Sequence, residues 1–142
     1  MDKPELPIEE WVNTVPERLR VDPLWDSGYY RLAMYLYDLV WVDCMQFKSD
    51  FRGREIASQL IRSAGGICAN VEEGYGRGIG SADYIRILRI ALGEARETQG
   101  WYLRGRHLLE SDLLERRMQV LAQIIALLVS TISRHRKNLS RT

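Results

Sequence analysis

Apolar residues recur at helical spacing along four long segments of this chain, and no other feature of the sequence constrains its fold as strongly. Residues three and four positions apart share one face of a helix, whereas a half-buried strand alternates apolar and polar residues. Sustained alternation of that kind is absent from the 142 residues. The pattern predicts helices over residues 23–47, 54–75, 82–109 and 111–136.

Each predicted helix carries an apolar face that we expect to join one shared core. The predicted core residues are Tyr30, Ala33, Met34, Tyr37, Trp41, Cys44, Ala57, Leu60, Ile61, Ala64, Ile67, Cys68, Val71, Tyr84, Ile87, Leu88, Ala91, Ala95, Thr98, Tyr102, Leu114, Met118, Leu121, Ile125, Leu128 and Ile132. Long amphipathic helices joined by short loops predict an all-α fold, an antiparallel up-down four-helix bundle, over residues 23–136. Residues 1–22 form an N-terminal extension, and residues 137–142 form a C-terminal tail.

Local signals mark the predicted helix ends. Asp22 before Pro23 is typical of a helix start, although Gly28 would allow a later one. Four glycines between residues 74 and 80 interrupt the second apolar pattern. Ser81 then supplies an N-cap for the third helix.

Length and composition limit the class of protein. A chain of 142 residues with 46% apolar and 27% charged residues is typical of one soluble globular domain. The longest uncharged run, residues 118–133, contains polar residues and is shorter than the ~20 apolar residues of a spanning helix. The acidic N-terminus does not resemble a signal peptide. We therefore expect a cytoplasmic protein that spans no membrane.

The last predicted helix carries a second apolar row beside its core face, formed by Leu113, Val120, Ile124, Leu127 and Thr131. One bundle core needs a single apolar stripe, so a second row favours another partner. We expect Leu113, Val120, Ile124 and Leu127 to form a homo-oligomer interface. The alternative is a helix buried deeply in its own bundle, under the N-terminal extension.

The third predicted helix carries an arginine stripe opposite its core face. Arg86, Arg89, Arg96 and Arg104 fall within a sector of about 80° on this helix. Guanidinium groups bind phosphate in a bidentate manner, so the stripe suits nucleic acid. Ion pairs within or between chains, or an ordinary solvated face, are the alternatives.

The second predicted helix carries a row of small and polar residues, Gln59, Ser63, Gly66, Asn70 and Glu73. This row lies about 140° from the centre of the apolar face, so we expect it to point away from the core. A solvated face is one interpretation of this polar seam. Amide hydrogen bonds to a neighbouring chain or loop, and a ligand site, are the others.

A search for catalytic and metal-binding patterns finds none above background. The glycine-rich turn before Ser81 lacks the strand and the lysine of a P-loop. His107 and His135 have no second ligand at helical spacing, and Cys44 and Cys68 lie on apolar faces. We therefore expect no enzymatic activity, no catalytic residues, no metal and no cofactor.

Three segments carry a family resemblance: SQLIRSA (58–64), NVEEGYGR (70–77) and YIRILRIALGEARE (84–97). Over about residues 23–136 the chain resembles the four-helix-bundle family first noted as proteins encoded in 23S ribosomal RNA intervening sequences. That family includes the accessory variability proteins of diversity-generating retroelements. The residues that match the family pattern are Gln59, Arg62, Asn70, Glu73, Gly74, Tyr75, Arg77, Arg86, Arg89 and Glu97.

The resemblance implies a homopentameric barrel that binds a reverse transcriptase and RNA or DNA through a basic surface. Together with the arginine stripe, the resemblance implies nucleic-acid contacts from Arg77, Arg86, Arg89, Arg96 and Arg104. The overall charge is only +1, but the charges are unevenly distributed. Residues 1–50 carry 5 basic and 10 acidic groups, whereas residues 51–142 carry 15 basic and 9 acidic groups. The leading hypothesis is therefore a non-enzymatic accessory protein. The alternative is a structural or protein-interaction oligomer without a nucleic-acid role.

Overall fold

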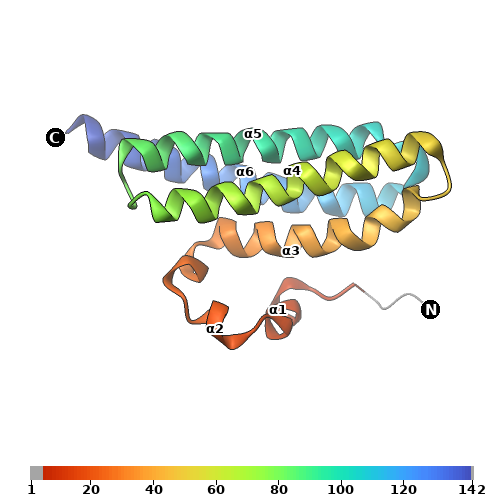
Figure 1. Ribbon diagram of the computed structural model, residues 1–142, viewed down its shortest axis with the longest axis horizontal. Coiled ribbons are helices and arrows are strands. Elements are labelled where there is room, and N and C mark those ends of the chain that lie inside the picture. Colours follow the sequence, from red (N-terminus) through yellow and green to blue (C-terminus); the bar gives the residue numbers. More distant parts are fainter. Residues whose placement is uncertain (1–4, 142) are drawn as a thin grey trace.

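The computed structural model of the chain describes residues 5–141, where every regular element is a helix. Four long helices lie side by side (Figure 1): α3 (Gly28–Asp43), α4 (Phe51–Gly76), α5 (Ala82–Arg104) and α6 (Ser111–Ser140). Contacts join α3 to α4, α4 to α5, α5 to α6, and α6 to α3. The predicted all-α fold class is confirmed. Residues 1–4 of the predicted extension and residue 142 of the predicted tail lie outside the described residues.

Several helix ends differ from the predicted bounds: α3 ends at Asp43 rather than at residue 47, α4 begins at Phe51 rather than at residue 54, and α5 ends at Arg104 rather than at residue 109. Ser81 caps α5 as predicted, because its hydroxyl accepts a hydrogen bond from the N–H of Tyr84. Asp22 caps only a short 3-10 helix, and α3 begins later, at Gly28. The last helix continues to Ser140, beyond its predicted end at residue 136.

The N-terminal extension packs against α3. It contains two short helices, α1 (Ile8–Trp11) and α2 (Glu17–Arg20). Trp11 stacks on Trp25 with ring centroids 6.1 Å apart, and its indole N–H donates to Asp38 at 2.8 Å. These contacts bury an aromatic cluster outside the four long helices, so α3 has apolar partners on more than one side.

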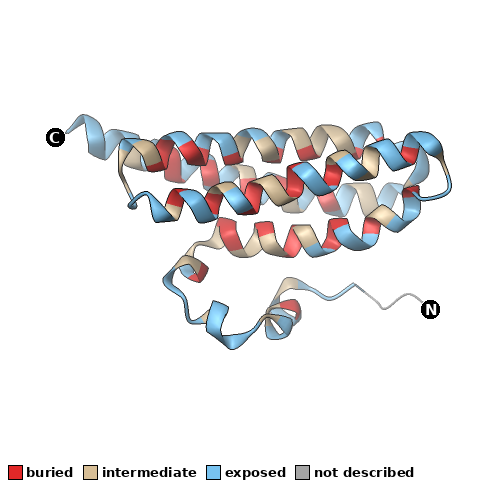
Figure 2. Ribbon diagram, viewed as in Figure 1, coloured by how far each residue is buried: buried red, intermediate tan, exposed pale blue. Residues whose placement is uncertain are grey.

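Buried residues concentrate on the inward sides of the long helices (Figure 2). The largest fully buried side chains are Leu36, Val40, Phe47, Leu60, Ile67, Val71, Leu88, Thr98, Tyr102, Leu121, Ile124 and Leu128. Burying one large aliphatic or aromatic side chain contributes roughly 1.5–3 kcal/mol. This core fixes α5 against α6, and the candidate site described below lies between these two helices.

Two predicted core residues are exposed. Trp41 is 65% exposed and Ile61 is 37% exposed, so both core predictions are wrong. Because α3 packs against α4, α6 and the N-terminal extension, its buried sector is wide and is not centred on the predicted face. Leu36 and Leu39 take inward positions instead.

A polar network lies inside the core near the end of α3. Arg117 donates from Nε and Nη2 to the Asp43 carboxylate at 2.7 and 3.0 Å, and Tyr102 donates its hydroxyl to Asp43 at 2.6 Å. Glu5 of the N-terminal extension also pairs with Arg117, at 2.6 Å. Burial alone would lower the pKa of Arg117, but the hydrogen bonds to Asp43 and Glu5 outweigh it and raise that pKa. The network links α3, α5, α6 and the extension.

The second apolar row of α6 is largely buried within this chain. Ile124 has no exposed surface and is a core residue, which corrects its assignment to an oligomer interface. Leu113 and Val120 are half-buried against the same core, and Leu127 is 39% exposed. The buried face of α6 is centred between the two predicted rows, because α3 and α5 pack against this helix from both sides.

Among the described residues, α6 is the one helix that is long and apolar enough to cross a membrane by length and composition. The expectation that the polar residues of α6 exclude such a span therefore does not hold on these two criteria. Core helices of soluble proteins pass the same test, so this finding is weak evidence for a span. Only 28% of the apolar stretch of α6 that meets these criteria is buried within the chain, so much of the surface of this helix stays open to a partner.

Candidate nucleic-acid interface

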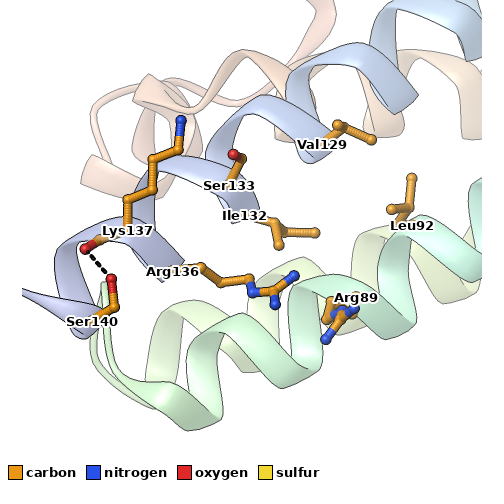
Figure 3. A pocket seen from close by; sticks show the side chains of 8 residues that line it. All are labelled: Arg89, Leu92, Val129, Ile132, Ser133, Arg136, Lys137 and Ser140. Atoms are coloured by element: carbon orange, nitrogen blue, oxygen red, sulfur yellow. Dashed lines mark hydrogen bonds between the residues drawn. The ribbon is translucent and has the colours of Figure 1, made fainter.

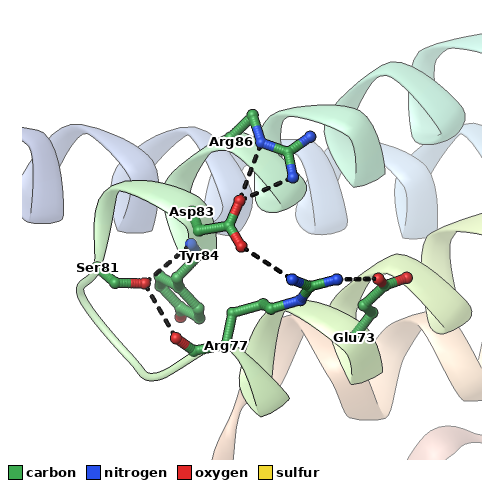
Figure 4. A network of polar contacts seen from close by, with 6 residues as sticks. All are labelled: Glu73, Arg77, Ser81, Asp83, Tyr84 and Arg86. Carbon is green, nitrogen blue, oxygen red and sulfur yellow. Dashed lines mark hydrogen bonds and ion pairs between the residues drawn. The ribbon is translucent and has the colours of Figure 1, made fainter.

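Two of the five predicted nucleic-acid-binding arginines are held by acids at the turn between α4 and α5 (Figure 4). Arg77 lies 2.9 Å from Glu73 and 3.3 Å from Asp83, and Arg86 lies 2.7 Å from Asp83. The hydrogen bond to Glu73, followed by the charge of Asp83, raises the pKa of Arg77. A phosphate at this turn would have to compete with both carboxylates, which makes Arg77 and Arg86 poor phosphate ligands.

The remaining arginines of the stripe divide between the two sides of α5. At about 100° per residue, Arg104 lies about 60° from Arg89 on the side that faces α4, and Arg96 lies about 20° on the other side. The guanidinium of Arg104 sits over the Trp101 ring at 4.7 Å. Arg89 and Arg96 form no ion pair or hydrogen bond with any residue that the structure describes. These two guanidinium groups therefore remain available to a ligand.

A cavity of about 520 Å³ lies between α5 and the carboxyl end of α6 (Figure 3). Its lining residues are Arg89, Leu92, Val129, Ile132, Ser133, Arg136, Lys137 and Ser140. Cations from two different helices line it: Arg89 of α5 and Arg136 of α6 extend toward each other, and Lys137 of α6 lies at its edge. None of these lining residues is acidic. We call these eight residues the cationic groove.

Sequence reasoning missed the α6 half of this groove. It treated α6 as ending at residue 136 and assigned the following residues to a tail. A signal was present, because Glu115 is the last acid of the chain and six arginines and lysines follow it. A second cavity beside the groove is lined by further cations, Arg134 and Arg141.

Cations in the last turn of a helix also stabilise the helix itself, because they offset its negative end. This effect explains Lys137 on α6 without any ligand. It does not explain Arg89, which lies in the first half of α5, far from the carboxyl end of that helix. The convergence of both helices on one cavity therefore favours an anionic ligand over helix stabilisation alone.

The polar seam of α4 faces α5, which corrects the prediction that it points away from the core. Ser63 has no exposed surface, and its hydroxyl accepts a hydrogen bond from Thr98 of α5 at 2.8 Å. Gly66 permits close packing, since a Cβ atom there would lie 2.8 Å from the Glu94 carboxyl carbon. Small residues at these positions let α4 and α5 approach each other.

The outer residues of the polar seam bond within the chain. Gln59 accepts a hydrogen bond from Arg62 at 3.0 Å, and Arg62 also pairs with Glu97 of α5. Asn70 donates to the carbonyl of Gly66 at 2.7 Å. Ser63 and Gly66 therefore pack between α4 and α5, whereas Gln59 and Asn70 form hydrogen bonds within α4.

Glu94, which lies against Gly66 of the polar seam, should make the stability of the protein depend on pH. Burial, followed by the nearby charge of Glu97, raises the pKa of Glu94 above its ordinary value of 4.5, and its buried Oε2 has no hydrogen-bond partner in the described chain. A raised folded pKa means that stability falls as pH rises above 4.5 toward that pKa. We expect Glu94→Gln to be about 1 kcal/mol more stable than wild type at neutral pH and equally stable at about pH 4.

Urea unfolding followed by circular dichroism at both pH values measures this effect. Glu115→Gln, at an exposed acid on α6, is the matched control and should change stability little at either pH. A stabilisation by Glu94→Gln that is the same at both pH values would contradict the proposed cause.

The described histidines and cysteines form no reactive or metal-binding cluster. Within residues 5–141, no group of three or more His, Cys, Asp or Glu residues is placed to hold a metal ion. Burial raises the pKa of Cys44 to about 11 and that of Cys68 to about 12, so both thiols are protonated at neutral pH. The His135 and Tyr84 rings are nearly perpendicular, with centroids 5.2 Å apart.

The helical fold and its cationic groove define an all-α protein with a candidate anion-binding surface, and sequence comparison identifies its family. The chain matches the family described as "23S rRNA-intervening sequence protein" over residues 26–130. The protein therefore belongs to this family. No curated protein matches the chain.

A solved crystal structure supports the fold. It is described as a protein with unknown function from the S23 ribosomal protein family of Bacteroides thetaiotaomicron. The two chains are 24% identical, and the match covers 73% of this chain and 97% of the other, with a TM-score of 0.65. At this identity the similarity concerns the fold alone.

Proposed function

We propose that the protein is a non-enzymatic helical bundle that binds RNA or DNA through the cationic groove. One observation carries the proposal: Arg89 of α5 and Arg136 of α6 extend toward each other in a cavity that Lys137 also lines and that has no acidic lining residue. Such an arrangement favours phosphate, which pairs with guanidinium and ammonium groups. The arginines held by acids at the α4–α5 turn are secondary to this groove.

The fold and the family resemblance supply the setting for this binding. We propose that the four long helices form an antiparallel four-helix bundle. The resemblance to accessory variability proteins adds a reverse transcriptase as the protein partner and a homopentamer as the assembly. In this view the bundle holds a nucleic acid for an enzyme and performs no chemistry itself.

Binding to labelled RNA and duplex DNA, followed by fluorescence anisotropy over a salt series, tests the proposal. Each phosphate contact releases counterions, so log K should fall linearly with log salt, by about 0.7 for each single-strand contact and 0.9 for each duplex contact. We expect binding at low salt with a slope of about −2 or steeper for the three cations. Absence of binding to every probe at about 50 mM salt would reject the proposal.

A second candidate function is self-association without nucleic acid, and it is favoured by an exposed apolar surface at the end of α3 and in the 3-10 helix that follows it (Cys44–Phe47). Trp41 and Val42 of α3 and Met45 of this 3-10 helix are 65%, 62% and 57% exposed and lie within five consecutive positions of the chain. Large exposed apolar side chains that are grouped on a surface are typical of protein interfaces. We propose that a second copy of this chain covers them.

We expect Trp41→Glu to lower the mass of the oligomer in solution, because a charge at the centre of an apolar interface must be desolvated. Light scattering measures this mass. Ile79→Glu, at an equally open position (62% exposed) in the α4–α5 turn, is the control and should leave the mass unchanged. An unchanged mass for Trp41→Glu would exclude this surface as the interface.

A further inference from the structure

We infer that the cationic groove accommodates one unpaired nucleotide of a single strand, with its base over the apolar end and its phosphate at the cationic end. This inference rests on the proposed function and specifies its ligand. It concerns which form of nucleic acid the groove selects.

The groove has two chemically different ends (Figure 3). Leu92, Val129 and Ile132 form one end, toward the middle of the two helices. Arg136 and Lys137 approach from the carboxyl end of α6. A bare phosphate would use only the cations and leave the apolar end in water. A ligand that joins an apolar ring to an anion matches both ends, and a nucleotide has that composition.

The dimensions of the groove agree with a ligand of this size. Its volume of about 520 Å³ falls within the ~300–1,000 Å³ that is usual for small-molecule sites. Ser133 also lines the groove, and its hydroxyl forms no hydrogen bond with the described chain. It is available to a sugar or base edge.

The apolar end selects unpaired bases. In a duplex, each base is stacked between neighbours and its faces are covered, so only the phosphates can reach the groove. In a single strand, a base can leave the stack and place its face on apolar side chains. The groove should therefore bind a single strand more tightly than a duplex of equal charge.

The test compares oligonucleotide probes of one length by fluorescence anisotropy at one low salt concentration. The probes are a single strand, the same strand without its bases (an abasic strand), the corresponding duplex, and adenosine monophosphate as a competitor. We expect the single strand to bind about fivefold or more tightly than the abasic strand, because burying about 40 Å² of the apolar face of one base contributes about 1 kcal/mol. The abasic strand carries the same phosphates, so the difference reports the base.

A pair of matched variants locates this effect. Val129 lines the apolar end and Ile90 lies on α5 outside the groove, and both are 44% exposed. Val129→Ser should weaken binding of the single strand about threefold or more and leave the abasic strand unchanged. Ile90→Ser should change neither.

Three outcomes would overturn the inference and leave the proposed function intact. These are equal binding of the normal and abasic strands, binding of the duplex as tightly as the single strand, and binding of adenosine monophosphate as tightly as the strand. The last result would mean that the groove does not distinguish a free nucleotide from a nucleotide within a strand. Failure of every probe to bind would overturn the proposed function as well.

Discussion

Replacing Arg117 by alanine should lower the free energy of unfolding by about 3–5 kcal/mol, the largest stability effect that we expect in this chain. The Arg117 and Asp43 side chains are 3% and 2% exposed. The substitution would leave a buried carboxylate with Tyr102 as its remaining hydrogen-bond donor in the described chain. A domain of this size has a total stability of about 5–15 kcal/mol, so the melting temperature should fall by roughly 6–20 °C.

Urea unfolding and thermal melts measure this loss, and the chain supplies its own control. Arg116 is the next residue and also pairs with Glu5, but its side chain is 49% exposed. Arg116→Ala should therefore cost less than about 1 kcal/mol. The double variant Asp43→Leu with Arg117→Met should recover much of the loss, because it removes both buried charges. Equal effects of Arg117→Ala and Arg116→Ala would contradict the structural role of the buried pair.

Removing the three charges of the cationic groove should produce the largest change in nucleic-acid affinity. The variant is Arg89→Gln, Arg136→Gln and Lys137→Gln together. A hydrogen bond to a charged group contributes about 1.5–3 kcal/mol, or roughly tenfold in affinity or more for each contact. We expect a loss of at least a hundredfold for single-stranded RNA and a salt slope shallower by about 2.

A variant with the same change in net charge tests whether position matters. Arg52, Arg54 and Arg106 are exposed, and none of them lines the groove. Replacing these three by glutamine should lower the affinity only slightly, through the weaker overall field. Equal losses in the two triple variants would mean that net charge, rather than the groove, determines binding.

The helical segments could be read from the sequence because helix formation depends on local signals. The apolar period, the Ser81 cap and the glycines of the α4–α5 turn all act within a few residues. The orientation of each helix about its own axis was harder to predict from the sequence. Ser63 and Gly66 look like a polar outer face from their angle alone, but their small size lets α5 pack against them. Size, rather than polarity, decided which side they occupy.

The buried ion pair was inaccessible to pattern reading for a different reason. A hydrophobic pattern counts Arg117 as a polar interruption of α6, yet it is buried because Asp43 compensates its charge. The two partners are 74 residues apart in the sequence. Only the packing of α3 against α6 brings them together, so no local window contains the signal.

The candidate site was predicted in part. Arg89 and Arg96 follow from helical spacing, and both are free of ion pairs in the described chain. Arg77 and Arg86 also follow from spacing, but the same turn supplies the acids that neutralise them. The α6 cations lie far along the chain from Arg89. Their convergence depends on how α5 and α6 cross, which the sequence pattern does not specify.

Methyl-detected NMR of the protein with single-stranded RNA tests most directly whether the cationic groove is the nucleic-acid site. Leu92, Val129 and Ile132 line the groove, and Ile56 and Leu108 line a separate cavity where α4 begins and α5 ends. We predict that the methyl signals of the first three residues shift as RNA is added and that those of Ile56 and Leu108 do not. Shifts confined to Ile56 and Leu108, or RNA binding without any shift at the groove, would contradict this account.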